Sequence, residues 1–593
     1  MSKFAVRQLD QKLVYLLLAA SALFSLIALR LLYLHIYRGQ ELTRISQRNF
    51  SRICQVTSLR GNILDCHGQL LATNRPVRNL CWQGTGNKQL SVTQLTNLTT
   101  IAQILGLELD IQLLMQAERR SKQLVIAADL SLAQLLQLEE RCADDPQVQI
   151  ETTFERHYPY GDLAAHVVGY LGAINFEKSG RMGLEKLFEQ ELQGQRGQKL
   201  MKVNAVGKQV AQIELTQAVR GHTLATTLDL PLQQLAERIF PPDYRGCLII
   251  MDPADGAIRA MLSRPNFAPS TFLKPLSALT WQSLQSSKPF INRAINATYP
   301  PASIFKLVSM TAALEGALVQ PETRFYCAGY MTFAGRKYHC HANKEGHGSV
   351  DMQAAIAQSC NVPFFEIGRQ LSIDRLAQYA QLYGLGQPTG ILFPEQSGLI
   401  PTRAWKLQVK REPWWAGETL SAIIGQSYLL VTPLQILRLI ASIFQGYLVK
   451  PRLLAAEPTV QAPLQVQLST LKFLRAAMRQ VVLVGTAKRL ANLPDLLIYA
   501  KTGTAQTKTI IDRARHIKGS ARHNCWFTSY FQYQEQTPLV MVILIENVPE
   551  GMQLATTTAK EFFGQYRQLC RAQLKALRPN DLLPPLSAAP PAA

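Results

Sequence analysis

Residues 299–309, YPPASIFKLVS, place a serine and a lysine three positions apart, Ser303 and Lys306. A serine hydroxyl becomes a good nucleophile only when a base removes its proton. On a helix, positions three apart share a face, and a buried lysine beside other cations can be neutral near physiological pH. The pair could thus be a nucleophile with its base. It could also be an ordinary helix start with Ser303 as the N-terminal cap.

Two later stretches carry residues of complementary types. AIAQSCNVPFF supplies Ser359 and Asn361 near an expected helix–loop junction, and LLIYAKTGTAQ supplies Lys501 at the end of a strand-like run. Ser359 could relay a proton to a leaving amine, and Asn361 could hold Lys306 together with a substrate amide. Lys501 could supply the positive field that keeps Lys306 neutral. The ordered trio S-x-x-K, S-x-N and K-T-G is far more specific than any one of its members.

The three residues after Lys501 are suited to binding a peptide substrate. At a strand edge, Thr502 and Thr504 could bind a carboxylate with their hydroxyls while the peptide adds as a further strand. Gly503 would permit its close approach. The backbone N–H groups of Ser303 and Thr504 would form an oxyanion hole. The motifs therefore indicate acyl transfer through a serine.

The N-terminal region predicts a membrane anchor. Residues 13–37 are predominantly apolar and long enough to span a bilayer, and no small-residue cleavage site follows them. Basic residues on both sides leave the orientation nearly even by charge, and the long C-terminal region favours an outside-facing body. A buried core helix is the alternative.

Composition limits the possible partners. The chain has 593 residues, 47% of them hydrophobic, and a formal net charge of +21. The hydrophobic fraction excludes a disordered protein. The positive charge suits a membrane surface or a pyrophosphate-bearing lipid. Because the basic residues are scattered, we expect no nucleic acid as a partner.

The remaining sequence predicts a multidomain α+β protein. We expect a tail at residues 1–12, the anchor at 13–37, a mixed α/β pedestal or dimerisation-like domain at 38–223 and a catalytic domain at 224–575. Residues 576–593 are too rich in proline and alanine to fold alone.

Together the motifs resemble those of class B penicillin-binding proteins over nearly the whole chain. RGNILDCHGQLLATN, HYPYGDLAAHVVGYLG and GLEKLFEQELQGQRG are similar to that family's pedestal motifs, and NRAINATYPPASIFK, IGQSYLLVTPLQ, KTGTAQ and NCWFTSYF to its transpeptidase motifs. The resemblance implies a single N-terminal transmembrane helix, an extended mixed α/β pedestal, and a transpeptidase domain whose antiparallel sheet is sandwiched by helices. Two residues depart from the pattern: Ala302 stands where glycine is usual, and Cys66 where arginine is usual.

The resemblance also implies an activity. A peptidoglycan D,D-transpeptidase is acylated at its serine, here Ser303, by a D-Ala-D-Ala stem peptide with loss of D-Ala, and an amine of a neighbouring stem then attacks the acyl-enzyme. β-Lactams would acylate the same serine. A membrane β-lactam sensor and a β-lactamase-like hydrolase share the motifs. The sensor would need a cytoplasmic signalling domain, and the hydrolase an efficient deacylating water.

Within the family the pattern is most similar to penicillin-binding protein 2, the group that acts in lateral wall elongation. The septal group, penicillin-binding protein 3, is the alternative. Similarity to the elongation group implies a RodA-type membrane glycosyltransferase and an MreC-type scaffold as partners. It also implies a place in the bacterial inner membrane, with the catalytic body in the periplasm.

Four potential metal ligands surround the second motif with the spacing C-x12-C-x6-H-x12-C: Cys327, Cys340, His347 and Cys360. Three thiolates and an imidazole form a closed tetrahedral zinc set, so we expect a structural zinc and no organic cofactor. Cys360 lies between Ser359 and Asn361, where a metal would brace the motif. The alternatives are a Cys327–Cys340 disulfide, free core thiols, or a set in which His339 or His341 replaces one ligand.

Overall fold

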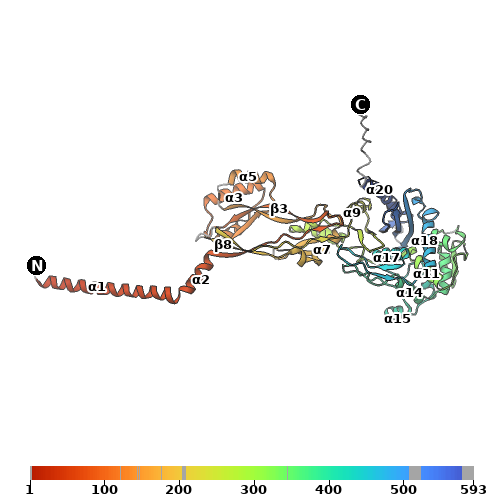
Figure 1. Ribbon diagram of the computed structural model, residues 1–593, viewed down its shortest axis with the longest axis horizontal. Helices are drawn as coiled ribbons and strands as arrows, with labels where there is room; N and C mark the ends of the chain where they lie inside the picture. The colour runs from red at the N-terminus through yellow and green to blue at the C-terminus, as the bar shows by residue number, and fades with distance from the viewer. Residues whose placement is uncertain are drawn as a thin grey trace, which may run out of the picture. The chain divides into compact units, whose positions relative to one another are not determined.

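The computed structural model describes residues 3–576 apart from positions 121, 143, 144, 146, 175, 176, 204–208, 343, 344 and 507–521. The chain divides into two compact units (Figure 1). The first contains residues 1–60, 74–155 and 193–221, and the second contains 61–73, 156–192 and 222–593. By their contacts, segments 61–73 and 156–192 are thus part of the second unit, together with residues 222–593.

The chain begins with helix α1 (Lys3–Leu32), a π-helical turn η1 (Tyr33–Tyr37) and helix α2 (Gly39–Phe50). Among the described residues, one helical segment, Leu13–Tyr37, is long enough and apolar enough to cross a membrane. Large apolar side chains are exposed along it, with Phe24 74% exposed. A row of apolar side chains without protein contacts is expected where lipid covers them. The apolar N-terminal helix predicted from the sequence is confirmed, and its exposed apolar surface is consistent with a membrane anchor.

The first unit consists of strands with helices packed over them. Its three-stranded antiparallel sheet has the order β1 (Ser51–Val56), β8 (Gly197–Val203), β9 (Gln209–Thr216). Strand β3 (Leu70–Gln83) pairs with β4 (Gln123–Ala127) and with β5 (Val148–His157). The helices of this unit are α3 (Val92–Leu105), α4 (Ile111–Arg119) and α5 (Leu132–Cys142). Ile101 of α3 and Leu138 of α5 lie in one buried apolar cluster with Leu80 of β3. Figure 1 shows the two helices side by side.

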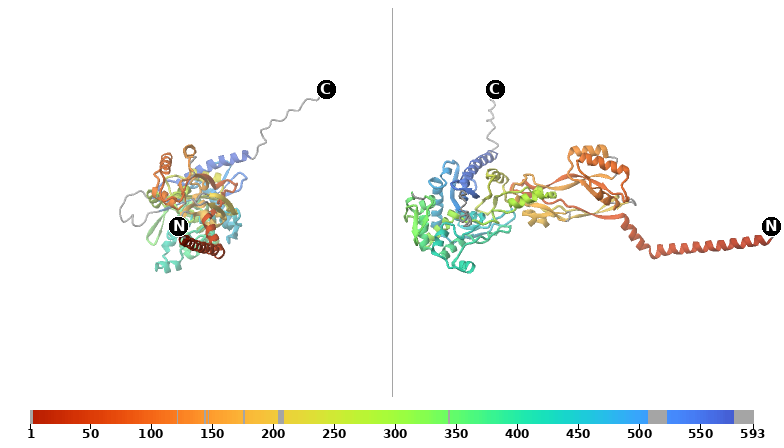
Figure 2. Two further views of the ribbon diagram at one scale, coloured as in Figure 1. Left: turned by 90° about the vertical axis from the view of Figure 1, so that its left-hand side faces the viewer. Right: turned by 180° about the vertical axis from the view of Figure 1, so that it is seen from behind.

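The second unit is centred on a five-stranded antiparallel sheet. Its order is β12 (Ile258–Arg264), β11 (Gly246–Met251), β21 (Leu539–Pro549), β20 (Arg522–Tyr533), β19 (Leu496–Gln506). Helices α9 (Leu230–Ile239), α17 (Pro433–Gln445), α18 (Leu468–Leu483) and α20 (Leu554–Ala576) contact it. In the right-hand view of Figure 2 the green helices and blue strands of this unit form one body.

Aromatic contacts show that helices cover both faces of this sheet. Successive side chains of a strand point to opposite faces. Tyr530 of β20 stacks on Phe444 of α17 with ring centroids 3.9 Å apart, whereas the next residue, Phe531, meets Phe563 of α20 edge-on at 5.1 Å. The predicted α+β fold with an antiparallel sheet between helices is confirmed.

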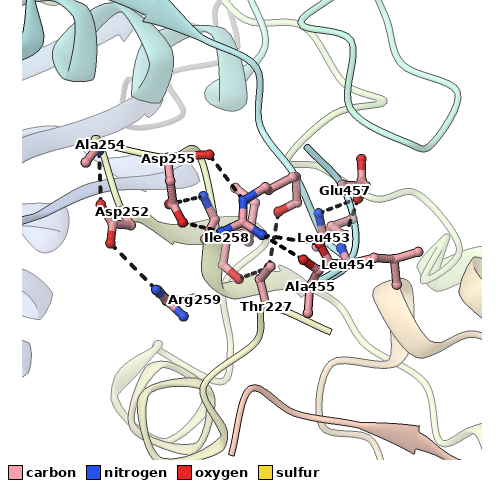
Figure 3. Close-up of polar contacts among 12 residues, drawn as sticks. Thr227, Asp252, Ala254, Asp255, Ile258, Arg259, Leu453, Leu454, Ala455 and Glu457 are labelled. Carbon is pink, nitrogen blue, oxygen red and sulfur yellow. Dashed lines mark hydrogen bonds and ion pairs between the residues drawn. The ribbon is translucent and has the colours of Figure 1, made fainter. Parts of the chain in front are cut away.

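The turn between β11 and β12 is fixed by its own carboxylates (Figure 3). Asp252 accepts the backbone N–H of Ala254 at 3.0 Å and lies 3.6 Å from the guanidinium of Arg259. Thr227 donates to the carbonyl of Ile258 at 2.8 Å. These bonds hold the edge strand β12 against the segment that precedes α9.

Candidate active site

Ser303 lies in a tight turn that a backbone hydrogen bond from a neighbouring segment holds in place. It belongs to the 3-10 turn η3 (Ala302–Ile304), directly before helix α11 (Lys306–Glu315). Ala302 has a left-handed φ of 50°. Its N–H donates to the carbonyl of Gly425 at 2.9 Å. The N-cap of α11 is Phe305, without a side-chain cap bond, so Ser303 does not act as the helix cap.

Lys306 is the first residue of α11 and is completely buried. Its Nζ donates to the carbonyl of Ser359 at 2.6 Å, to Asn361 Oδ1 at 2.7 Å and to the carbonyl of Cys360 at 3.2 Å. Burial lowers the pKa of Lys306 to about 8, although the nearby Cys340 and Cys360 thiols act in the opposite direction. The neutral form of this amine is therefore more accessible near physiological pH than that of an exposed lysine.

Lys306 and Lys501 converge on one hydroxyl. Ser359 Oγ lies 3.3 Å from Lys306 Nζ and 3.1 Å from Lys501 Nζ. Burial, and then the charge of Lys306, lower the pKa of Lys501 well below its ordinary value. Two buried ammonium groups on one hydroxyl repel each other, so the site favours a state with one proton fewer. Such an arrangement can accept a proton from a neighbouring group and pass it on.

Ser359 is held in an uncommon backbone conformation. It connects helices α12 (Met352–Ala357) and α13 (Val362–Gln370), with a left-handed φ of 57°. A non-glycine residue in this conformation costs about 1 kcal/mol or more and is common at functional sites. The turn directs both the carbonyl and the hydroxyl of Ser359 to Lys306.

A cavity of about 600 Å³ opens above these groups. Most of the predicted site residues line it: Ser303, Ser359, Asn361, Thr502, Gly503 and Thr504. Lys306 and Lys501 are 0% exposed and lie beneath the cavity wall. Within the described part of the chain, no hydrogen bond joins the Ser303 hydroxyl to Lys306. Hydrogen bonds between reacting groups often form only when substrate is bound.

The K-T-G triplet lies on β19, an outermost strand of the sheet. Such a strand has one side available for pairing with a peptide. The hydroxyl of Thr502 lies 2.6 Å from that of Thr486, while Thr504 is exposed. A Cβ atom at Gly503 would lie 3.3 Å from the carbonyl oxygen of Pro301. Glycine therefore lets this strand approach the Ser303 turn closely.

Several further cavity residues have no assigned role in the sequence analysis: Gln426, Thr486, His523, Trp526 and Glu550. The indole of Trp526 donates to the carbonyl of Pro300 at 3.1 Å and so supports the segment before Ser303. Glu550 is exposed and lies 3.8 Å from His523. The stretches IGQSYLLVTPLQ and NCWFTSYF contain Gln426 and Trp526, so the motif resemblance pointed to their segments without identifying the side chains.

The four predicted metal ligands come together behind the second motif. Cys340 Sγ lies 3.9 Å from Cys360 Sγ and 3.5 Å from His347 Nδ1, and Cys327 Sγ lies 3.6 Å from His347 Nδ1. All four ligand atoms lie within 4.8 Å of one another. The cysteines are free thiols, so the alternative of a Cys327–Cys340 disulfide is wrong for this structure. His341 Nδ1 lies 3.9 Å from Cys340 Sγ, outside the cluster.

These distances fit a tetrahedral metal ion. With Zn–S bonds of about 2.3 Å and a Zn–N bond of about 2.05 Å, tetrahedral geometry places two sulfur atoms about 3.8 Å apart, and sulfur and nitrogen about 3.6 Å apart. The buried cluster of three cysteines and one histidine could therefore hold a metal ion.

Comparison with known proteins identifies both parts of the chain. Residues 55–226 match the penicillin-binding protein dimerisation domain, and residues 246–565 match the penicillin binding protein transpeptidase domain. The chain is 30% identical over 522 residues to the peptidoglycan D,D-transpeptidase MrdA of Acinetobacter baumannii, covering 83% of this chain and 77% of that protein. It is 28% identical to MrdA of Haemophilus influenzae, covering 88% and 86%.

Solved structures show the same architecture. The Helicobacter pylori penicillin-binding protein PBP2, solved in complex with MreC, has a TM-score of 0.75 at 26% identity, with 88% of this chain and 99% of that chain covered. A chain from a structure titled for the coordination of polymerization and crosslinking by a peptidoglycan synthase complex has a TM-score of 0.73 at 29% identity. It covers 97% of this chain and 99% of that chain.

The transpeptidase match covers more than half of the chain and contains all three motifs together with the buried lysine pair beneath the cavity. The match to the dimerisation domain accounts for the region before it. The chain therefore belongs to the class B penicillin-binding proteins.

Proposed function

We propose that the protein is a peptidoglycan D,D-transpeptidase. Ser303 attacks the carbonyl between the two terminal D-Ala residues of a stem peptide, while Lys306 removes the hydroxyl proton. The C–N bond breaks, the leaving amine takes up a proton, and D-Ala departs. An amine of a second stem peptide then attacks the ester carbonyl, the bond to Ser303 Oγ breaks as the cross-link forms, and a proton from that amine restores the Ser303 hydroxyl.

One observation carries this proposal: both buried lysines reach the same Ser359 hydroxyl below the cavity that Ser303 lines. A hydroxyl between two amines of lowered pKa can pass a proton from the nucleophile to the leaving group. Asn361 holds Lys306 at 2.7 Å and so keeps its amine oriented. No other role for two fully buried lysines in contact with one serine follows as directly.

Substrate binding is assigned to β19. We propose that the stem peptide pairs with the free side of this strand and that Thr502 and Thr504 bind its terminal carboxylate. The backbone N–H groups of Ser303 and Thr504 would stabilise the oxyanion. The close approach at Gly503 supports this arrangement, because a larger residue would push β19 away from the serine turn.

Covalent labelling tests the nucleophile. We expect Ser303→Ala to abolish labelling by a fluorescent penicillin while the protein stays folded and membrane-bound. Retained labelling of the folded variant at another serine would contradict the assignment. The fate of the acyl-enzyme separates the alternatives: slow hydrolysis with transfer to an added amine supports a transpeptidase, and rapid hydrolysis indicates a β-lactamase-like enzyme.

We also propose that zinc is the metal held by the cluster of three cysteines and His347. The cluster joins three separated segments, so zinc binding there would add to local folding energy. Zinc would hold Cys360 in place and so support Ser359 and Asn361 on either side of it. Elemental analysis of protein purified without added metal tests this proposal. The wild type should contain one equivalent of zinc that Cys340→Ser lacks, and a wild-type value near zero would exclude zinc at this cluster.

The setting is proposed from the relatives. The similarity to MrdA proteins and to PBP2 bound to MreC favours a role in wall elongation, with an MreC-type scaffold and a RodA-type glycosyltransferase as partners. The anchor helix would hold the protein in the inner membrane with its catalytic body in the periplasm. Proposed boundaries are 1–12 for the tail, 13–37 for the anchor, 38–223 for the pedestal, 224–575 for the transpeptidase domain and 576–593 for the C-terminal tail.

A further inference from the structure

Three different metal-ligand types meet at a second place in the second unit: Cys66, His67 and Asp229. Their ligand atoms all lie within 4.8 Å of one another, and His67 Nε2 lies 3.3 Å from Asp229 Oδ2. Tetrahedral zinc with one nitrogen and one oxygen ligand separates those two atoms by about 3.4 Å. We propose that these three residues bind a zinc ion, at a site separate from the cluster behind the active site.

The loop that carries Cys66 and His67 is fixed before any metal binds. The Cys66 N–H donates to the carbonyl of Leu228 at 2.8 Å. The carboxylate of Asp65 accepts the N–H groups of His67 at 2.9 Å and Gln69 at 2.7 Å. Asp65 is buried and occupied by these backbone bonds, so it is not a ligand. A loop held in this way presents its ligands at little further entropic cost.

The two carboxylate oxygens of Asp229 have different partners. Its Oδ1 accepts the N–H of Leu232 at 3.0 Å and caps helix α9. Its Oδ2 faces His67. A zinc ion bound here would tie the loop at residues 65–69 to the start of α9. The side chain of His67 is 54% exposed, so water can supply the fourth ligand, as in sites with three protein ligands.

The competing explanation is that Arg259 neutralises this pocket without a metal. Its guanidinium lies near the Cys66 thiol and 3.6 Å from the carboxylate of Asp252 (Figure 3). The guanidinium hydrogen-bonds the Cys66 thiol, but this bond is present at any zinc concentration and is not a coordinate bond to the sulfur. Protection of this thiol by zinc therefore distinguishes the two explanations.

The thiol itself provides a site-specific readout. Of the nine cysteines whose burial the structure describes, Cys66 alone is partly exposed and the others are buried. Full-length protein in detergent, reduced and then stripped with a chelator, would be treated with N-ethylmaleimide at increasing zinc concentrations. Peptide mapping would report modification at residue 66. We expect zinc to protect this thiol, and a chelator to restore its reactivity.

Variants test the other two ligands while leaving the reporting thiol in place. His67→Ala and Asp229→Asn should raise the zinc concentration for half-protection by at least about tenfold. Asparagine still caps a helix, so Asp229→Asn should keep the start of α9. His222→Ala, at an exposed histidine outside both clusters, is the matched control and should show no shift. Equal protection in wild type and His67→Ala, or no protection by zinc, would overturn the proposal.

Stoichiometry provides an independent check. In buffered zinc, Cys340→Ser should retain one zinc equivalent, and the combined Cys340→Ser and Cys66→Ser variant should lose it. A Cys340→Ser variant that binds no zinc would overturn the proposal. Labelling of Ser303 by penicillin reports separately on the transpeptidase function, which can stand or fall independently of this site.

Discussion

His166 is a buried neutral imidazole whose titration should weaken the fold at low pH. It lies in the short helix α6 (Ala165–Val168), and its Nε2 donates to the carbonyl of Pro289 at 2.6 Å. Its ring meets Phe267 edge-on with centroids 5.2 Å apart. Burial lowers the pKa of His166 to about 4 from the ordinary value of 6.5. The folded state therefore disfavours the charged form.

The sign and size of the effect follow from these two values. The unfolded segment binds a proton below about pH 6.5, whereas the folded one binds it only near pH 4, so stability is full above 6.5 and is lost as the pH falls. At pH 5 the loss is about 2 kcal/mol, and it reaches about 3.4 kcal/mol below pH 4. The contribution of His166 should thus raise the opening equilibrium of this segment about 30-fold between pH 7.5 and pH 5.

Neighbouring charged groups also act on stability in this pH range. Arg264 and Arg293 lower the pKa of His166 further, and both guanidinium groups stay charged throughout. Glu237 accepts the N–H of Ala164 at 3.2 Å and has a raised pKa because it is buried. A carboxyl group with a raised pKa stabilises the folded state as the pH falls, so Glu237 opposes the effect of His166.

Hydrogen–deuterium exchange of full-length protein measures the effect, using peptides that contain residues 165–169 and correcting for the intrinsic pH dependence of exchange. His166→Gln is the control, because its amide can still donate to Pro289 but does not titrate. Wild type should lose about 30-fold more protection than His166→Gln between pH 7.5 and pH 5. Equal losses in the two proteins would refute the assignment of a neutral buried imidazole.

Three further predictions concern the active site. Lys306→Arg should slow acylation by a fluorescent penicillin nearly as much as Lys306→Ala, by at least about a hundredfold, because a guanidinium does not release its proton; a near-normal rate would show that only the charge matters. Chelation of zinc or Cys340→Ser should lower the melting temperature and slow acylation, and an unchanged melting temperature would contradict a structural zinc. Gly425→Ala should destabilise the protein by at least about 2 kcal/mol and slow acylation of Ser303, since its Cβ would lie 2.1 Å from the carbonyl oxygen of Ala302 at a φ of +78°; wild-type melting and acylation would contradict this expectation.

The sequence predicted those parts of the site whose chemistry is local. Ser303 and Lys306 are three positions apart, and the four metal ligands include three cysteines, a residue type with few other uses at such spacing. The strand-like run LLIYAKTGTAQ likewise forms a strand, β19. In each case, a short stretch of sequence contains the whole signal.

Other features depend on the fold and have no local signal. Thr486 follows α18, which packs against β19. The Thr486 hydroxyl meets that of Thr502 there and so contributes to the cavity. His523 reaches the same cavity from β20, and Glu550 reaches it from the turn after β21. A single threonine or glutamate is common on any surface, so the sequence could not distinguish these residues from solvated ones.

All three consecutive residues of the second motif contact Lys306, and the middle one, Cys360, also belongs to the cluster of three cysteines and His347. Ser359 presents its hydroxyl to both lysines, and Asn361 binds Lys306. Between them, Cys360 directs its sulfur to Cys340 at 3.9 Å and its carbonyl to Lys306 at 3.2 Å. Ser359 has a left-handed φ, so the chain leaves the helical path at this residue. In a continuous helix, neighbouring side chains would instead point about 100° apart around one axis. A metal bound at the sulfur of Cys360 would therefore be one residue away from the amine of Lys306, so a metal that never touches substrate would help to orient the base.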